Sequence, residues 1–486
     1  MIYLEQTYKM VRVYLDSNIF RYLGNVDDSE ITFFNKLIEF KDDFIFYYSS
    51  AHLSDLSRDI SERKYQDLSF MEQLVDKNFL NLNNDEIVVN VKIASPTEAF
   101  NNMNFETVNN SIDFDKIFEE LGEESVEKEE AKKLFKSFLN TPIGNLGIPN
   151  LPDAVYNNTP FNEIIPKLSD KNTFSDLIKG MLDIFSKLYE DPSIWRKFRN
   201  YSIENLLNRK FDIDIENPNF NELLKDTPLQ KSFLEFVEDS IKHNKSLDKQ
   251  KYHHFFISAY ACLNLLGIDK ENNRKVVFSS FQDDAQHAFY AAHCDYLVSK
   301  DEQLLLKAKS LYNLFKIETK VLNLDEFKEL IENKNPTSLN LEIFTKELLS
   351  ACINSELHKE FSIEPQNKVT EYNLQTPLFG YFNHLQVVIK HNESPIYTFY
   401  KEFKNYSRFI SYIEFERLTN RVVSVLGKDN EGKLYFTEDD KNQIVTTNWL
   451  GRIWHFENST FHFGLDINEN QMCFSWIPNI KISLEE

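Results

Sequence analysis

Four aspartates stand where a divalent cation could be bound. Each lies shortly after a short apolar run of the strand type, and they are Asp16, Asp55, Asp284 and Asp301. Clustered carboxylates repel one another, so their convergence makes sense chiefly if cations lie among them. Hard oxygen ligands without Cys or His are typical of Mg²⁺ or Mn²⁺ sites. Two such ions can activate a water and stabilise a leaving oxygen, which is the usual solution for phosphodiester hydrolysis.

The apolar runs before these aspartates predict the strands of a parallel sheet. They are residues 11–15, 44–48, 276–278 and 296–298, with a further strand at 320–322. Helical patterns come between them, at 29–40, about 283–293, after Asp301 and from Asp325. The carboxyl ends of parallel strands meet at one edge of an α/β sheet, so the four aspartates are expected to converge there.

Helix capping is the alternative explanation for these acids. Aspartate at the start of a helix commonly accepts hydrogen bonds from free backbone N–H groups. Asp16, Asp55 in the first turn of its expected helix and Asp284 could each do only that. Taken alone, each is better explained as a cap. Taken together, the four favour a site.

Three segments around these acids together resemble a PIN-domain nuclease. They are Val13–Phe20 (VYLDSNIF), Ser49–Leu56 (SSAHLSDL) and Asp284–Asp301, which starts DAQHAFYAA and ends DYLVSKD. In that family the metal is bound by carboxylates from four motifs. They are a strand ending in Asp, an acid on a following helix, an Asp-Ala start to a helix, and a Thr/Ser-x-Asp strand end. The resemblance therefore implies that Asp16, Asp55, Asp284 and Asp301 are the catalytic metal ligands. It also implies a parallel-sheet α/β/α sandwich.

The sequence departs from that family pattern in three places. Asp55 stands where Glu is commoner, which shortens the reach of the side chain. Asp283 precedes Asp284 and competes with it for the ligand role. The segment between Asp55 and Asp284 is far longer than in a minimal PIN domain, so its helices could cap the cleft.

Four further residues are predicted to support the ligands. Asn18 and Ser299 sit beside two of the aspartates and could orient a carboxylate or bind phosphate, although both types are common in turns and caps. His287 follows Asp284 by one helical turn, so it could face the same cleft, although a structural histidine is the commoner case. Asp283 completes the set.

The chain divides into four segments. The expected PIN-like domain is formed by residues 1–94 and 251–336, the latter after a helical insertion at 95–250. The insertion contains Glu/Lys-rich segments such as 123–139 and 174–189. Residues 337–486 are rich in aromatic and β-branched runs, which predicts a β-rich (α+β) domain preceded by a helix around 341–351.

Charge limits the partners that this chain can bind. Its 486 residues carry a formal net charge of −22, which excludes a generic histone-like binder because the overall field repels phosphate. A polyanion must be held by metal ions or by a local basic patch. The densest basic cluster is Arg196, Lys197 and Arg199 in the insertion, and it is the predicted substrate rim, although such spacing is also routine on a solvated helix.

Cysteine and glycine usage exclude other classes. The four cysteines form no C-x-x-C pair, which argues against a zinc ribbon or a disulfide framework. The start of the chain lacks a signal-peptide pattern and no run is long enough for a membrane span, so a cytoplasmic protein is expected. No G-x-G-x-x-G follows a strand, which excludes a dinucleotide-binding turn.

Two motifs in residues 337–486 invite a functional interpretation. Residues 427–433 match a phosphate-binding loop except for the final Ser or Thr, and 433–437 reads as a strand, so a hairpin turn is predicted instead. The aromatic runs 451–456, 461–463 and 474–476 could stack nucleic-acid bases, but alternating aromatics in a β-rich domain usually form its core.

The sequence thus predicts a Mg²⁺- or Mn²⁺-dependent PIN-like nuclease. RNA is favoured over DNA because the resemblance implies a ribonuclease more often. The extra domains indicate regulated activity, with residues 337–486 sensing a protein or ligand, and a toxin or antiviral effector would suit such control. The alternative is an inactive PIN-like scaffold whose acids are caps and whose C-terminal domain binds nucleic acid or protein.

Overall fold

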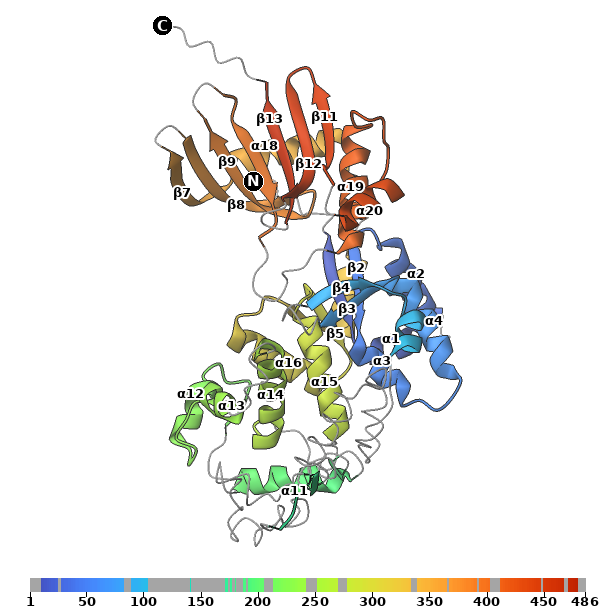
Figure 1. Cartoon of the computed structure of the whole chain (residues 1–486), viewed down its shortest axis with the longest axis vertical. Helices are drawn as coiled ribbons and strands as arrows, with labels where there is room; N and C mark the ends of the chain where they lie inside the picture. Colours follow the sequence, from blue (N-terminus) through green and yellow to red (C-terminus); the bar gives the residue numbers. More distant parts are fainter. Residues whose placement is uncertain are drawn as a thin grey trace, which may run out of the picture. The chain divides into compact units, whose positions relative to one another are not determined.

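The structure, a computed structural model, describes most of the chain outside the insertion (Figure 1). The described residues are 10–24, 28–82, 89–103, 140, 171–173, 175–176, 180, 187–188, 191–204, 213–241, 251–269, 278–333, 339–364, 367–390, 393–402, 411–446, 449–466 and 471–479. They fall into two compact units. The first unit is Met1–Asn102, His287–Leu305 and Phe315–Glu486, and the second is Met103–Gln286 with Leu306–Leu314.

A six-stranded sheet forms the N-terminal part of the first unit, in the order β4-β3-β2-β1-β5-β6. Its strands are β1 (Val11–Leu15), β2 (Phe44–Ser49), β3 (Asn78–Leu82), β4 (Val89–Ile93), β5 (Tyr296–Ser299) and β6 (Lys320–Asn323). All neighbours pair in parallel except β3 and β4, which form an antiparallel pair. Every residue of β1 and β2 is buried, as expected for central strands of an α/β sheet.

The order of the strands creates a switch point at the carboxyl end of β1. From β1 the chain moves to β2 and β3 on one side, whereas β5 and β6 add on the other side. In open α/β sheets this reversal leaves a crevice outside the strand ends, where ligands usually bind.

Helices alternate with these strands. They are α1 (Ser17–Leu23), α2 (Asp28–Glu39), α3 (Ser50–Ser57), α4 (Arg63–Val75), α5 (Pro96–Asn102), α15 (Phe278–Ala291), α16 (Glu302–Phe315) and α17 (Leu324–Glu332). Strand β2 leads directly into α3 through a capping box: the Ser49 hydroxyl accepts from the Ala51 N–H, and His52 Nδ1 accepts from the Ser49 N–H. This box fixes the start of α3 at the carboxyl edge of the sheet.

A seven-stranded antiparallel sheet forms the C-terminal part of the first unit, in the order β11-β12-β13-β10-β9-β8-β7. Its strands are β7 (Glu356–Glu364), β8 (Asn367–Leu378), β9 (Phe382–Ile389), β10 (Ile396–Tyr400), β11 (Arg452–Phe456), β12 (Ser459–Asp466) and β13 (Gln471–Pro478). The helices are α18 (Leu341–Ile353), α19 (Tyr412–Leu426) and α20 (Glu438–Val445). Phe344 of α18 packs on Phe379, Phe461 and Phe474.

Two ion pairs and a hydrogen bond join α19 and its cap residue Ser411 to the N-terminal part of the unit. The guanidinium of Arg12 in β1 donates to both carboxylate oxygens of Glu414, at 2.7 and 2.8 Å, and both side chains are 1% exposed. Tyr47 donates to Ser411 at 2.9 Å, and Arg421 pairs with Asp43 at 3.0 Å. Arg12 is the second residue of β1 and Asp43 lies in the turn before β2, so the two ion pairs lie toward the edge of the sheet opposite to Asp16.

The second unit is helical where it is described. Its elements are α11 (Pro192–Ser202), α12 (Phe220–Leu223), the 3₁₀ turn η3 (Leu224–Asp226), α13 (Phe233–Ile241), α14 (Lys251–Leu266) and the adjoining parts of α15 and α16. Arg199 of α11 is buried and donates to Asp269 at 2.6 Å, and Lys307 lies 3.3 Å from the same carboxylate. The prediction of Arg199 as a substrate contact is therefore wrong, because burial against Asp269 removes it from the surface.

The strands predicted at 11–15, 44–48, 296–298 and 320–322 are confirmed, and so is the β-rich C-terminal part. Two local predictions are wrong. Phe278 begins α15 rather than ending a strand, and 276–277 lie outside the described residues. Residues 433–437 form no strand, because Asp429 Oδ1 accepts from the Glu431 and Lys433 amides and the loop then leads into α20.

The predicted insertion helices lie largely outside the described residues. Of 123–139 none is described, and of 174–189 only 175–176, 180 and 187–188 are. Three residues of the aromatic runs in the C-terminal sheet, Trp454, Phe463 and Phe474, belong to the core and are at most 2% exposed, whereas Phe456 is 46% exposed.

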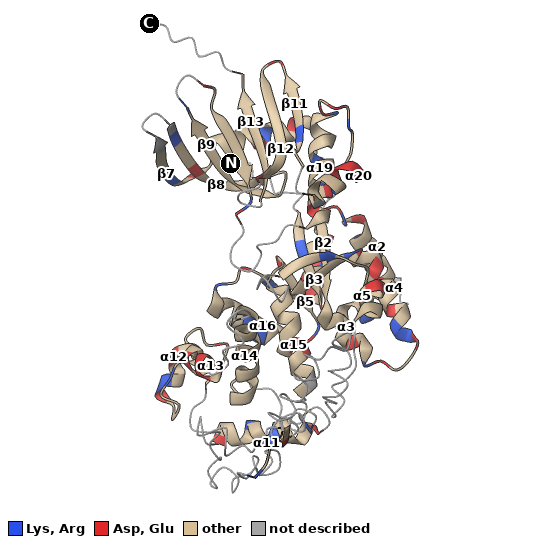
Figure 2. Ribbon diagram, in the orientation of Figure 1, with Lys and Arg blue, Asp and Glu red and all other residues tan. Residues whose placement is uncertain are grey.

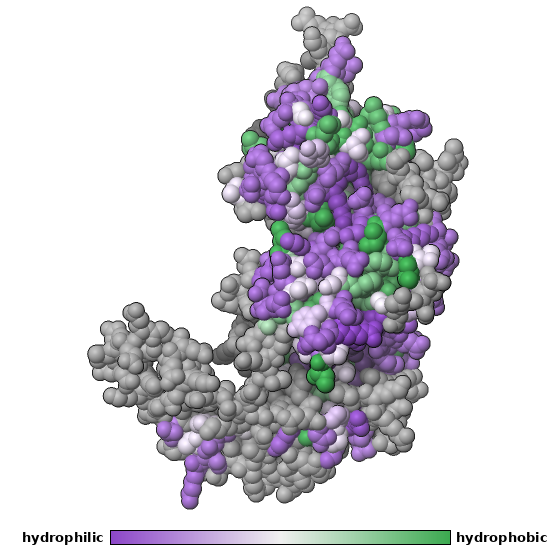
Figure 3. Space-filling model, turned by 90° about the vertical axis from the view of Figure 1, so that its right-hand side faces the viewer, coloured by the Kyte–Doolittle hydropathy of each residue, from purple (hydrophilic) through white to green (hydrophobic). Residues whose placement is uncertain are grey.

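Among the described residues on the face drawn in Figure 3, hydrophobic residues form small separate patches. Within the described part of the chain, none of the helices has the length and apolar character needed to cross a membrane.

Candidate metal centre

Three side chains of the first unit converge at the carboxyl edge of the six-stranded sheet. Asp16 directly follows β1, Asp55 lies in the second half of α3, and His287 lies on α15. One ligand atom from each of these residues lies within 4.8 Å of the other two. The cluster combines two carboxylates and one imidazole, and Asp16 and His287 are buried while Asp55 is 20% exposed.

Asp16 is held by side chains rather than by a helix end. It occupies the cap position of α1 but makes no side-chain cap bond. Its Oδ2 accepts from Asn18 Nδ2 at 2.5 Å and from Ser299 Oγ at 2.7 Å. These two donors fix the carboxylate so that Oδ1 faces His287 Nε2, at 3.6 Å. Burial raises the pKa of the Asp16 carboxyl, while His287 and Ser299 act in the opposite direction.

Asp55 faces the same imidazole from α3. Its Oδ2 lies 3.1 Å from His287 Nε2, and its Oδ1 lies 3.9 Å from Arg58 Nη1. Burial alone would raise the pKa of this carboxyl, but the hydrogen bond and charge of His287 hold the pKa below its ordinary value. Asp55 therefore stays ionised, and it is not a cap, because Ser49 caps α3.

A buried hydrogen-bond network fixes the other side of His287. Its Nδ1 lies 2.8 Å from the hydroxyl of Tyr14, which also lies 2.7 Å from Ser49 Oγ and 3.3 Å from His52 Nδ1. Burial raises the pKa of the Tyr14 phenol, so the hydroxyl keeps its proton.

The partners of His52 determine its tautomer. The Ser49 backbone N–H can only donate, so His52 Nδ1 accepts, at 3.1 Å. The Leu15 carbonyl can only accept, so Nε2 carries the proton, at 2.7 Å. Burial, with the charge of His287, lowers the pKa of His52 to about 3. His52 is thus a neutral side chain with Nδ1 as an acceptor.

The other predicted ligands are outside this three-residue cluster. Asp301 is exposed and caps α16, since its Oδ1 accepts from the Gln303 and Leu304 N–H groups at 2.8 and 3.1 Å. Asp284 is half-buried and Asp283 buried, both on α15 in the part assigned to the second unit. His287, predicted to support the ligands, belongs to the cluster itself.

Sequence reasoning missed Tyr14 and His52. Two positional signals could have identified them. Residues two apart on a strand share a face, which relates Tyr14 to Asp16, and residues three apart on a helix share a face, which relates His52 to Asp55.

The donor set fits a divalent cation. Two carboxylate oxygens and one ring nitrogen within 4.8 Å of one another are ordinary ligands for such an ion. Asn18 and Ser299 orient Asp16, and Tyr14 orients His287, as outer partners do in protein metal sites.

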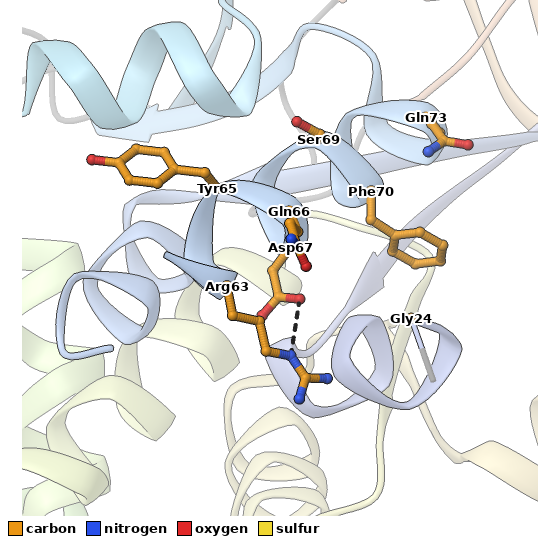
Figure 4. Close-up of a pocket in the computed structure, with 8 residues that line it drawn as sticks. All are labelled: Gly24, Arg63, Tyr65, Gln66, Asp67, Ser69, Phe70 and Gln73. Carbon is orange, nitrogen blue, oxygen red and sulfur yellow. Dashed lines mark ion pairs between the residues drawn. The ribbon is translucent and has the colours of Figure 1, made fainter. Parts of the chain in front are cut away.

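A surface hollow lies on α4, and it is not this cluster. Its volume is about 850 Å³, and it is lined by Gly24, Arg63, Tyr65, Gln66, Asp67, Ser69, Phe70 and Gln73 (Figure 4). Asp67 pairs with Arg63 at 3.9 Å there. The hollow includes none of the three clustered side chains.

No known protein-family model, no curated protein and no solved structure matches this chain. The interpretation of the site therefore depends on its own geometry.

Proposed function

We propose that this protein is a metal-dependent nuclease with a PIN-like domain and that it hydrolyses phosphodiester bonds, with RNA as the favoured substrate. The observation that carries the proposal is the convergence of Asp16, Asp55 and His287 at the switch point of a mostly parallel sheet. That edge is where α/β enzymes place their ligands. The mostly parallel α/β sheet and the sequence motifs around Asp16 and Asp55 support the PIN-like assignment.

Asp16 and Asp55 would hold the cation, together with His287. A bound divalent ion would supply an activated water and shield the charge that develops on the phosphate. A second ion, as the sequence motifs imply, would need a further carboxylate, and Asp301 is the other predicted ligand within the first unit. Since Asp301 Oδ1 already caps α16, only its Oδ2 is left for that role.

The substrate rim is better placed on α3 and α4 than on α11. Arg58 adjoins Asp55 and is 44% exposed, and Arg63 at the start of α4 is 58% exposed. Arg21 and Lys64 both act electrostatically on Asp59, so they belong to the same neighbourhood. Figure 2 shows basic and acidic residues interspersed along the ribbon of the described elements. In a chain with a net charge of −22, a local basic group beside the acids is what a phosphate backbone requires.

Cleavage of labelled single-stranded RNA, structured RNA and DNA tests the proposal. We expect cleavage with Mn²⁺ or Mg²⁺ and none with EDTA, and products with 5′-phosphate and 3′-hydroxyl ends. Asp16→Asn and Asp55→Asn should each abolish it. Asp325→Asn, an exposed acid on α17, is the charge-matched control and should cleave like the native protein.

Two results would overturn the nuclease assignment. One is cleavage by Asp16→Asn at the native rate. The other is absence of cleavage of every substrate together with absence of metal binding in calorimetry, which would favour the scaffold alternative. An Asp301→Asn variant separates the two roles of Asp301: a ligand role predicts loss of cleavage, and a capping role predicts only a small loss of stability.

A further inference from the structure

We infer that His287 is a direct metal ligand through Nε2, that Tyr14 positions it, and that the site therefore selects a transition-metal ion over Mg²⁺. This inference rests on the proposed function, because it concerns the same metal centre. It differs from the all-carboxylate site that the sequence motifs imply.

The first argument is the direction of the imidazole. His287 is 1% exposed, and its Nε2 faces Asp55 Oδ2 at 3.1 Å and Asp16 Oδ1 at 3.6 Å. A cation bound by these two carboxylates would lie in front of Nε2. The nitrogen is thus placed to bind that cation, provided that its proton is on Nδ1.

The second argument is that the Tyr14 hydroxyl can accept a hydrogen bond from His287 Nδ1–H. Binding through Nε2 requires Nδ1 to be a donor, and its neighbour is the Tyr14 hydroxyl at 2.8 Å. Tyr14 can accept only if its own proton has another acceptor. Ser49 Oγ, at 2.7 Å, is that acceptor, because the lone pair of His52 Nδ1 already accepts from the Ser49 N–H. The network therefore allows the tautomer that metal binding needs.

The third argument is the chemistry of the ligand set. Mg²⁺ prefers oxygen ligands and retains several waters, whereas imidazole nitrogen suits Fe²⁺ and Zn²⁺, and affinity for a mixed nitrogen and oxygen site rises from Mn²⁺ through Fe²⁺ to Co²⁺. One nitrogen and two carboxylates thus favour these ions. This centre would bind Fe²⁺, Co²⁺ or Zn²⁺ in preference to Mg²⁺.

Tyr47 offers a matched control for Tyr14. The two tyrosines are paired in register on neighbouring strands, and both are 0% exposed. The Tyr47 hydroxyl bonds to Ser411, away from the cluster. Tyr14→Phe leaves Ser49 Oγ bonded to the Ala51 N–H and His52 Nδ1 bonded to the Ser49 N–H, so His287 Nδ1 is the main group to lose a partner.

The experiment uses the full-length protein and measures metal binding rather than cleavage. Calorimetry compares Mn²⁺, Co²⁺ and Mg²⁺, and pulsed electron paramagnetic resonance of bound Mn²⁺ detects a coordinated ¹⁴N nucleus. We expect at least tenfold tighter binding of Co²⁺ than of Mg²⁺ and a clear ¹⁴N coupling. His287→Gln should abolish the coupling and reduce the preference. Tyr14→Phe should weaken Mn²⁺ binding by about 10- to 100-fold, and Tyr47→Phe should not.

The possible failures are distinct. Native protein that binds Mn²⁺ without ¹⁴N coupling, or binds Mg²⁺ as tightly as Co²⁺, overturns the role of His287 and leaves the nuclease proposal standing. Equal Mn²⁺ affinity for Tyr14→Phe and native protein overturns the role of Tyr14. Native protein that binds none of the three ions overturns both this inference and the proposed function.

Discussion

Replacing Asp16 with asparagine should separate metal binding from folding. The carboxylate is buried, and its Oδ2 accepts from Asn18 and Ser299. The amide oxygen of asparagine can accept the same two bonds. With His287 protonated, the metal-free cluster of two carboxylates and one imidazolium carries a net charge of −1. Replacing one carboxylate with an amide brings the net charge to zero. Burying less uncompensated charge offsets the lost attraction to His287, so we expect the free energy of unfolding in EDTA to change by less than about 1 kcal/mol.

Metal should then reveal the difference. An ion at about 100 times its dissociation constant stabilises the native protein by roughly 2.7 kcal/mol, and a change of 1 kcal/mol shifts Tm by about 2–4 °C in domains of this size. The native protein and Asp325→Asn should thus gain about 5–10 °C with Mn²⁺, and Asp16→Asn should gain none. Scanning calorimetry in EDTA and in Mn²⁺ measures both quantities.

Either of two outcomes would refute this reasoning. If Asp16→Asn loses more than about 2 kcal/mol in EDTA, the carboxylate is needed for the fold and the charge argument is wrong. If Mn²⁺ raises the Tm of Asp16→Asn as much as that of the native protein, the ion binds elsewhere. His287→Gln, unlike Asp16→Asn, should be destabilised in EDTA. Its free energy of unfolding should fall by about 3 kcal/mol, because the substitution leaves two facing carboxylates without a positive charge between them.

Three further predictions concern stability, pH and substrate binding. Glu414→Gln should cost about 3–5 kcal/mol of unfolding free energy, because it leaves Arg12 buried without its counter-ion; a loss below 1 kcal/mol in chemical denaturation would contradict this. The pKa of His52 is about 3 in the folded protein and near its ordinary value in the unfolded protein. As pH is lowered, the unfolded state therefore binds the proton first, and the stability of the folded protein decreases. Between pH 7 and 5 the native protein should lose about 2 kcal/mol more than His52→Asn, and equal losses would refute the assignment of a neutral His52. Arg58→Ala should weaken RNA binding and reduce the slope of log affinity against log salt concentration by about one. Lys346→Ala, on the exposed face of α18, is the control and should change neither quantity. Unchanged affinity of Arg58→Ala in salt titrations would remove Arg58 from the rim.

The strands that build the site were predictable from local sequence. Short apolar runs ending at polar residues predicted β1, β2, β5 and β6, and parallel strands bring their carboxyl ends together. Asp16 and Asp55 could therefore be assigned to one edge of the sheet from the sequence alone. The roles of Asn18 and Ser299 stay predictions, although both donate to Asp16.

Side-chain partners far apart in sequence were not predictable. Its sequence neighbours predicted Arg199 at the surface, but the fold buries it in an ion pair with Asp269. Asp301 stood in a metal-ligand pattern, yet its Oδ1 caps α16. The pairing of Arg12 with Glu414 joins residues from opposite ends of the chain and leaves no periodic signal.

The sequence by itself thus determined four strands of the six-stranded sheet, its polar edge and two of the three clustered side chains. Only the tertiary structure decided that His287 completes the cluster and that Tyr14 and His52 support it. The physical reason is that strand and helix periodicity fix which face a residue takes within its own element. Which donors meet which acceptors depends on how separate elements pack together, and that packing carries no local signature.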